Sequence, residues 1–220
     1  MRVSLALKFP TLVMNAWYLD DGTIIGPPLL VRAAYEDMVA NGKELGFFIN
    51  GKKCELISFN TGEVATVFPE STSSDPNMKM KVFSPGDCSL LGCSIGTDDA
   101  VDRSRTTLNT SAQVLLHRLP TLGNPQVALT LLRLCGGNPR MVHTARGAQP
   151  TPALTVFDSN VRACATAILG IPFTEPQWRQ ASLPLRFGGL GLRSTRQHAA
   201  QSFLASALKA SSLASSVARS

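Results

Sequence analysis

The sequence has few of the residues that build metal centres. Its five cysteines include no Cys-x-x-Cys pair, and only three histidines accompany them, so a zinc site is not expected. The cysteine count is odd, and Lys8 and Pro10 interrupt the only apolar stretch near Met1 that could resemble a signal peptide. Both observations indicate reduced thiols in an intracellular protein, either nuclear or cytoplasmic.

Long apolar runs are also missing. The 14 prolines and 17 glycines interrupt every hydrophobic stretch before it reaches the length of a membrane span, so no membrane partner is expected. With 44% hydrophobic and 16% charged residues, the chain is too apolar to stay unfolded. Its 220 residues suit one full domain or two small ones, each with a hydrophobic core.

The excess of positive charge is confined to the second half of the chain. Residues 1–97 carry 8 Lys and Arg against 10 Asp and Glu, whereas residues 98–220 carry 13 against 5. Twelve of those 13 cations are Arg, whose planar guanidinium suits phosphate groups. The asymmetry favours a polyanionic partner such as a nucleic acid, although solvated helix faces would give the same count.

The first half shows the spacing of mixed strands and helices. Two strand-like runs within residues 11–26 flank Asp20-Asp21-Gly22 and predict a β-hairpin. A helix with one buried face is expected from Pro28 to about Gly42. Three weaker patterns predict a second hairpin within residues 47–57 around Asn50-Gly51, a surface insertion over 60–80 with a strand at 64–68, and one strand over 88–95.

From residue 97 onward the apolar spacing becomes helical. Helices are expected over 101–119, 125–134, 153–169 and 195–213, joined by links rich in Gly and Pro. Asn124 is the expected N-cap of the second of these helices. The predicted fold class is therefore α+β, with a first domain over 1–97 and a mainly α-helical domain over 98–220.

The run from Tyr18 to Asp21 is the sharpest local feature of the sequence. It resembles the Tyr-x-Asp-Asp signature of reverse transcriptases, which lies on a hairpin turn of the polymerase palm and presents carboxylate to two magnesium ions. Residues 45–55 are similar to the Gly-Leu-x-Ile-Asn-x-x-Lys-Cys-Glu run of retroelement polymerases, and residues 90–96 to the strand that grips the primer end. Residues 131–135, Phe157-Asp158 and 183–193 are similar to the helical region that follows the palm in retrotransposon-type reading frames.

This resemblance implies the C-terminal part of a polymerase palm over residues 1–97, followed by a helical thumb-like region and extension over 98–220. It implies RNA-directed DNA synthesis with Mg²⁺, deoxynucleoside triphosphates and a template–primer RNA–DNA duplex as partners. Asp20 would bind the metal, Asp21 would be a less direct second carboxylate, and Lys53 would lie near the nucleotide phosphates. The residues implied to contact nucleic acid are Tyr18, Leu91, Gly92, Arg103, Arg105, Arg118 and Arg133.

One Asp-Asp pair is a poor site for two magnesium ions, because hard cations take several oxygen ligands. In the family, the palm has a further metal-binding Asp well upstream of the hairpin, together with fingers that hold template and nucleotide. Only 17 residues precede Tyr18 here, and none is acidic. The chain is therefore expected to be a fragment that is inactive unless another chain supplies the missing ligands.

Two other interpretations stay open. The first is a non-catalytic retroelement relic whose basic half still binds a duplex through its phosphates. The second is a haloacid-dehalogenase-like phosphatase, since residues 19–23 resemble the motif Asp-x-Asp-Gly-Thr. In that alignment Leu19 stands where the nucleophilic Asp belongs, and no doubly wound α/β pattern follows. The Gly-rich run over 183–193 has the wrong spacing for a phosphate-binding loop and predicts a tight connector.

Overall fold

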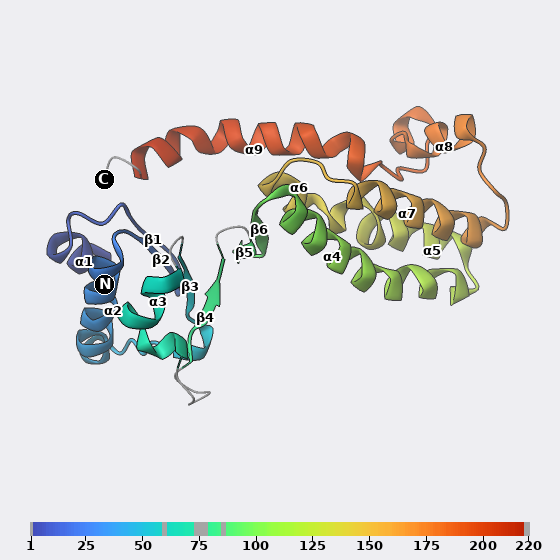
Figure 1. Cartoon of the computed structure of the whole chain (residues 1–220). Coiled ribbons are helices and arrows are strands. Elements are labelled where there is room, and N and C mark those ends of the chain that lie inside the picture. Colours follow the sequence, from blue (N-terminus) through green and yellow to red (C-terminus); the bar gives the residue numbers. More distant parts are fainter. Residues whose placement is uncertain (1, 59–60, 73–78, 85–86, 218–220) are drawn as a thin grey trace. The chain divides into compact units, whose positions relative to one another are not determined.

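The chain divides into two compact units. The computed structural model describes residues 2–58, 61–72, 79–84 and 87–217 (Figure 1). Met1–Pro85 together with Ala210–Ser220 form the N-terminal unit, and Gly86–Lys209 form the helical unit. The described elements are mostly helices, and each described sheet has two strands, so the predicted α+β class is confirmed. The finer division into palm and thumb at residues 97 and 98 stays a prediction.

The N-terminal unit mixes short strands with helices. The expected hairpin is present, because β1 and β2 pair as antiparallel strands, and the expected helix is present as α2. A parallel pair, β3 and β4, completes the described sheets of this unit. The described elements are α1 (Arg2–Lys8), β1 (Met14–Tyr18), β2 (Asp21–Ile25), α2 (Pro28–Gly42), β3 (Glu55–Ile57), α3 (Thr61–Val67) and β4 (Lys81–Phe83).

The core of the N-terminal unit is small. Ala34 and Met38 lie one helical turn apart on α2 and are buried against Leu5 of α1. The hairpin covers this pair with Trp17 and Ile24, which are only partly buried. The first helix, the hairpin and α2 are therefore held together by one narrow apolar stripe.

The second predicted hairpin is absent, so the prediction for residues 47–57 is wrong. The side chain of Asn50 accepts a hydrogen bond from the backbone N–H of Lys52, and the chain turns into a short 3₁₀ helix, Gly51–Lys53. An Asn side chain that bonds its own backbone two residues on competes with the tight hairpin turn. Strand β3 then pairs with β4, which lies far along the sequence.

The strand predicted at residues 64–68 is also wrong. Helix α3 occupies this stretch, and its residue Val64 is buried together with Phe68. The four-residue spacing of the two side chains places them on one helical face, where Phe68 meets the ring of Tyr35 edge to face at 6.4 Å. Residues 73–78 of the predicted insertion lie outside the described residues.

The helical unit contains three of the four predicted helices, α4, α5 and α7, and most of the fourth, α9. Two further helices, α6 and α8, fall outside the predicted ranges, and the single strand predicted over 88–95 is a hairpin formed by β5 and β6. Thr97 and Asn124 cap α4 and α5 through their side chains, as predicted for Asn124. The described elements are β5 (Asp87–Leu90), β6 (Cys93–Gly96), α4 (Asp98–Arg118), α5 (Pro125–Leu131), α6 (Val142–Gly147), α7 (Ala153–Leu169), α8 (Glu175–Ser182) and α9 (Thr195–Val217).

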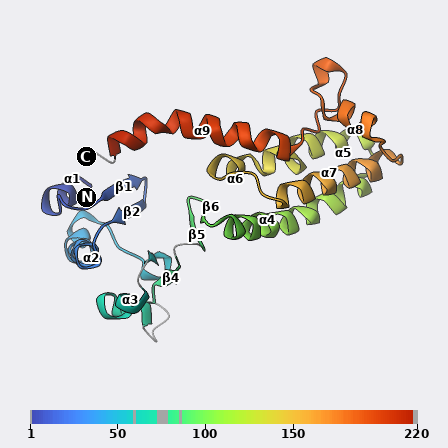
Figure 2. The same ribbon diagram turned by 45° about the horizontal axis from the view of Figure 1, so that its top comes forward.

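Helices α4 and α7 lie side by side and enclose the main core of the helical unit (Figures 1 and 2). Leu154 and Phe157 of α7 are completely buried, as are Leu132 and Met141 from the segments that follow α5. No helix within the described residues is both long and apolar enough to cross a membrane.

The Gly-rich run forms the tight connector that the sequence predicts. Gly188 takes a left-handed conformation with φ 72°, and the backbone N–H of Gly191 donates to the carbonyl of Leu183. A Cβ at Gly189 would lie 2.0 Å from the Leu183 carbonyl oxygen. Only glycine can occupy a position with so little space.

Asp158 of α7 joins the connector to the last helix. Its carboxylate accepts hydrogen bonds from the hydroxyl of Ser194 and from the backbone N–H groups of Thr195 and Arg196. These N–H groups lie at the start of α9 and have no partner within the helix. Asp158 therefore caps α9 from a neighbouring helix.

Arg105 of α4 is completely buried in the helical unit. Its guanidinium donates to the carbonyl oxygens of Thr144, Ala148 and Gln149. It also donates to the hydroxyls of Thr144 and Thr151. Burial lowers the pKa of this guanidinium from its ordinary value, and the nearby carboxylate of Asp102 opposes the shift. One side chain thus fixes the whole segment from α6 to the start of α7 onto α4.

We expect Arg105→Met to lower the free energy of unfolding of the helical unit by about 3 kcal/mol, because it leaves several buried oxygens without donors. Trp178 lies in this unit, so urea unfolding followed by its fluorescence in a Trp17→Phe background provides the measurement. Arg118→Met, at an exposed position of the same helix, is the matched control and should change stability by less than about 0.5 kcal/mol. Equal effects of the two substitutions would contradict the role of Arg105.

Candidate functional site

The turn of the first hairpin presents the Tyr-x-Asp-Asp run. Tyr18 pairs with Asp21 across the two strands, so Leu19 and Asp20 form a two-residue turn. The φ of Leu19 is 56°, in the left-handed region, which costs an L-residue roughly 1 kcal/mol. The sequence favours a turn at Asp21-Gly22, but the observed turn lies two residues earlier, and Gly22 belongs to β2. A Cβ at Gly22 would be 2.7 Å from the ring of Trp17, which explains the glycine.

Both carboxylates of the hairpin are exposed, and Tyr18 beside them is 66% exposed. In the described part of the chain, no group of three or more His, Cys, Asp or Glu side chains comes together. Two adjacent carboxylates can contribute to a magnesium site, but they do not by themselves supply the several oxygen ligands that each ion takes. Asp20 and Asp21 therefore fit only part of a metal site.

Lys53 lies at the end of the Gly51–Lys53 turn and is exposed. Within the described residues it forms no ion pair with Asp20 or Asp21. Its predicted place near nucleotide phosphates therefore stays a prediction.

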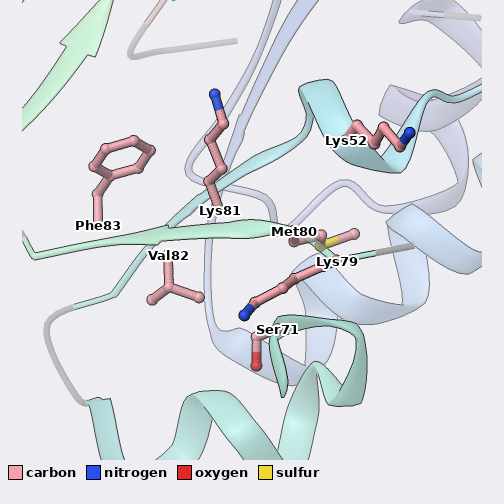
Figure 3. A pocket seen from close by; sticks show the side chains of 7 residues that line it. All are labelled: Lys52, Ser71, Lys79, Met80, Lys81, Val82 and Phe83. Atoms are coloured by element: carbon pink, nitrogen blue, oxygen red, sulfur yellow. The ribbon is translucent and has the colours of Figure 1, made fainter. Parts of the chain in front are cut away.

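A hollow of about 700 Å³ lies beside β4 in the same unit. Three of its lining residues are lysines, but Figure 3 shows that the side chains of Lys52, Lys79 and Lys81 point in different directions. Phe83 and Val82 extend to opposite sides of the strand (Figure 3). The hollow does not bring the three ammonium groups together on one ligand.

The turn of the second hairpin, β5–β6, consists of Leu91 and Gly92, the two residues that the resemblance assigns to the primer end. Leu91 has φ 50° and Gly92 has φ 76°. Leu19 and Leu91 are the non-glycine residues with positive φ in the described part of the chain, and each occupies a hairpin turn. Strained backbone of this kind concentrates at functional sites.

His143 of α6 supports the second turn. Its Nε2 lies 2.9 Å from the carbonyl oxygen of Leu91 and 3.3 Å from the Sγ of Cys93. Burial raises the pKa of the Cys93 thiol, while the positive charges of Arg105 and Arg146 act in the opposite direction. The helix and the hairpin approach closely at this point, because a Cβ at Gly147 would be 2.7 Å from the same sulfur.

The four predicted arginine contacts have different environments. Arg103 and Arg118 are exposed on α4, and Arg133 is half-buried with its side chain against Gly191. The prediction for Arg105 is wrong, because a side chain with no exposed surface and five hydrogen bonds inside the protein cannot contact phosphate.

Sequence reasoning missed the residues that surround the second turn. His143 and Arg146 are more than 50 residues from Leu91 in the chain, and no local pattern links them. The error at Arg105 was avoidable, because it lies on the same helical stripe as the buried residues Val101, Asn109, Ala112 and Leu116.

Comparisons with known proteins add no assignment, since no family model, curated protein or solved structure matches this chain.

We expect Leu19→Gly to raise the free energy of unfolding of the N-terminal unit by about 0.5 kcal/mol or more, because glycine adopts the left-handed conformation without a Cβ clash. Trp17 lies on this hairpin, so its fluorescence during urea unfolding in a Trp178→Phe background follows the unit. Leu29→Gly, at an exposed position in α2, should instead lower stability by up to about 1 kcal/mol. Destabilisation by both substitutions would contradict the strained turn.

Proposed function

We propose that the chain is the C-terminal palm and thumb-like part of a reverse transcriptase and binds a template–primer duplex. The observation that carries the proposal is the turn of the β1–β2 hairpin. The Tyr-x-Asp-Asp run forms a two-residue turn with one residue at positive φ and both carboxylates in solvent. The resemblance implies a hairpin turn that presents carboxylate to metal, and the exposed Asp20 and Asp21 support this proposal.

The charge distribution supports a nucleic-acid partner. The helical unit contains 12 Lys and Arg against 6 Asp and Glu, whereas the N-terminal unit contains 9 of each. All of the net charge of +6 therefore belongs to the helical unit. Arginine-rich surfaces of this kind bind polyanions through their phosphates, independently of base sequence.

The proposal does not include autonomous catalysis. Asp20 and Asp21 would contribute to Mg²⁺ binding, and Mg²⁺ would supply Lewis acidity toward phosphate oxygens. Further oxygen ligands would come from bound triphosphate or from another polypeptide, because no third His, Cys, Asp or Glu side chain among the described residues joins the pair. What the chain itself provides is an exposed carboxylate turn and a basic surface.

Binding of a short fluorescein-labelled RNA–DNA duplex should weaken steeply as salt rises. If five arginines contact phosphate, the slope of log K against log salt is about −4 to −5, measurable by fluorescence anisotropy between roughly 50 and 300 mM KCl. An unlabelled duplex as competitor verifies reversibility. Absent or salt-independent binding would contradict the proposed function.

Primer extension by the purified chain tests the statement on catalysis. We expect no incorporation of deoxynucleotides with Mg²⁺, either by the wild-type chain or by Asp20→Asn, because the ligand set at the turn is incomplete. Incorporation by the wild-type chain that Asp20→Asn abolishes would show that the chain is an active polymerase. The same two proteins should bind the duplex with similar affinity.

A further inference from the structure

The stretch between Asp102 and Asp158 is free of acidic residues. Residues 103–157 contain six Arg and two His but no Asp or Glu. One of the six, Arg105, is buried, so the others determine the surface charge of the stretch. Arg140 and Arg146, in the second half of the stretch, have no Asp or Glu within ten residues in the sequence, which favours a polyanionic ligand.

Arg140, His143 and Arg146 lie on one side of the segment that contains α6. Arg140 ends a 3₁₀ turn that leads into α6, and the three residues follow at three-residue spacing. Residues three apart lie on roughly the same side of both a 3₁₀ turn and an α-helix. All three are exposed, whereas Met141, Thr144 and Ala145 on the other side are buried.

The turn of the β5–β6 hairpin adjoins this basic side. His143 contacts the carbonyl oxygen of Leu91, and Arg146 is close enough to Cys93 to influence the pKa of its thiol. Figures 1 and 2 both show α6 and the hairpin at the same end of α4. Leu91 is 55% exposed, so the turn presents apolar surface beside α6, the helix that contains Arg146.

We propose that Arg140 and Arg146, together with the Leu91–Gly92 turn that His143 supports, form a binding surface for the phosphodiester backbone of the duplex. The two guanidinium groups bind phosphate oxygens with their forked donors, and Leu91 packs against the sugar between them. This inference rests on the proposed function, but it assigns duplex binding to α6 and the hairpin instead of to α4.

The basic side chains of this surface favour nucleic acid over an acidic membrane as the ligand. The surface has Arg and no Lys, and Arg presents a planar fork that matches phosphate oxygens in two-point contacts, whereas Lys acts as a point charge. The hairpin offers two adjacent exposed leucines, Leu90 at the end of β5 and Leu91 in the turn, which is little apolar area for insertion into a bilayer.

The double variant Arg140→Gln/Arg146→Gln tests the surface. We expect its affinity for the RNA–DNA duplex to fall about tenfold or more and the salt slope to become shallower by about 2, one for each lost phosphate contact. The matched control is Arg179→Gln/Arg186→Gln, which removes the same charge from exposed positions on α8 and the connector and should keep the wild-type slope. Far-UV circular dichroism verifies that both variants are folded.

A second measurement uses the wild-type chain and does not depend on any variant. Cys93 lies between the turn and α6, so bound duplex should slow its alkylation by N-ethylmaleimide severalfold, as followed by peptide mass spectrometry. If the double variant is unfolded, this protection still decides the question.

The outcomes separate the two proposals. If the wild-type chain does not bind duplex, the proposed function itself fails. If the wild-type chain binds but the double variant keeps its affinity and slope, or Cys93 is not protected, the surface lies elsewhere and only the present inference is overturned. Binding to phosphatidylserine vesicles in preference to the duplex, with loss in the double variant, would also overturn it in favour of a membrane surface.

Discussion

The buried guanidinium of Arg105 determines how the helical unit is arranged. It is fixed to three backbone carbonyls and two hydroxyls between Thr144 and Thr151, and the adjacent Asp102 accepts a hydrogen bond from the backbone N–H of Ala153 at the start of α7. A buried charge is costly unless all its donors are satisfied. The segment from α6 to α7 therefore has one position on α4 that satisfies them.

This constraint extends to the surface that we assign to nucleic acid. Because Arg105 fixes the end of α6, the opposite side of that helix is fixed as well, and His143 meets the turn of the second hairpin. Arginine thus has two different roles in one stretch of chain. Arg105 organises the interior, whereas Arg140 and Arg146 are exposed and belong to the surface that we propose for nucleic acid.

The strongly periodic parts of the fold could be predicted from the sequence. Helix α7 has the predicted bounds, and Asn124 caps α5 as expected, because apolar spacing and capping are local effects. The position of the β1–β2 hairpin could be predicted, but the residues of its turn could not. Leu19 adopts a φ that is unfavourable for leucine, and no sequence pattern indicates such a conformation. The prediction of a hairpin over residues 47–57 was wrong because the side chain of Asn50 accepts a hydrogen bond from the backbone of Lys52, and this bond replaces strand pairing. The support of Leu91 by His143 joins residues 52 positions apart, and such a contact exists only once the helices have packed.

The close contact between Gly147 and Cys93 has an evolutionary consequence. A methyl group at position 147 would overlap the sulfur, and the α6 backbone cannot move away while Arg105 holds the carbonyl oxygens of Thr144 and Ala148. A larger residue at position 147 can therefore be accepted only after a smaller one has replaced Cys93. In a lineage that preserves this fold, the two positions should drift as a coupled pair, although one lies on a strand and the other at the end of a helix.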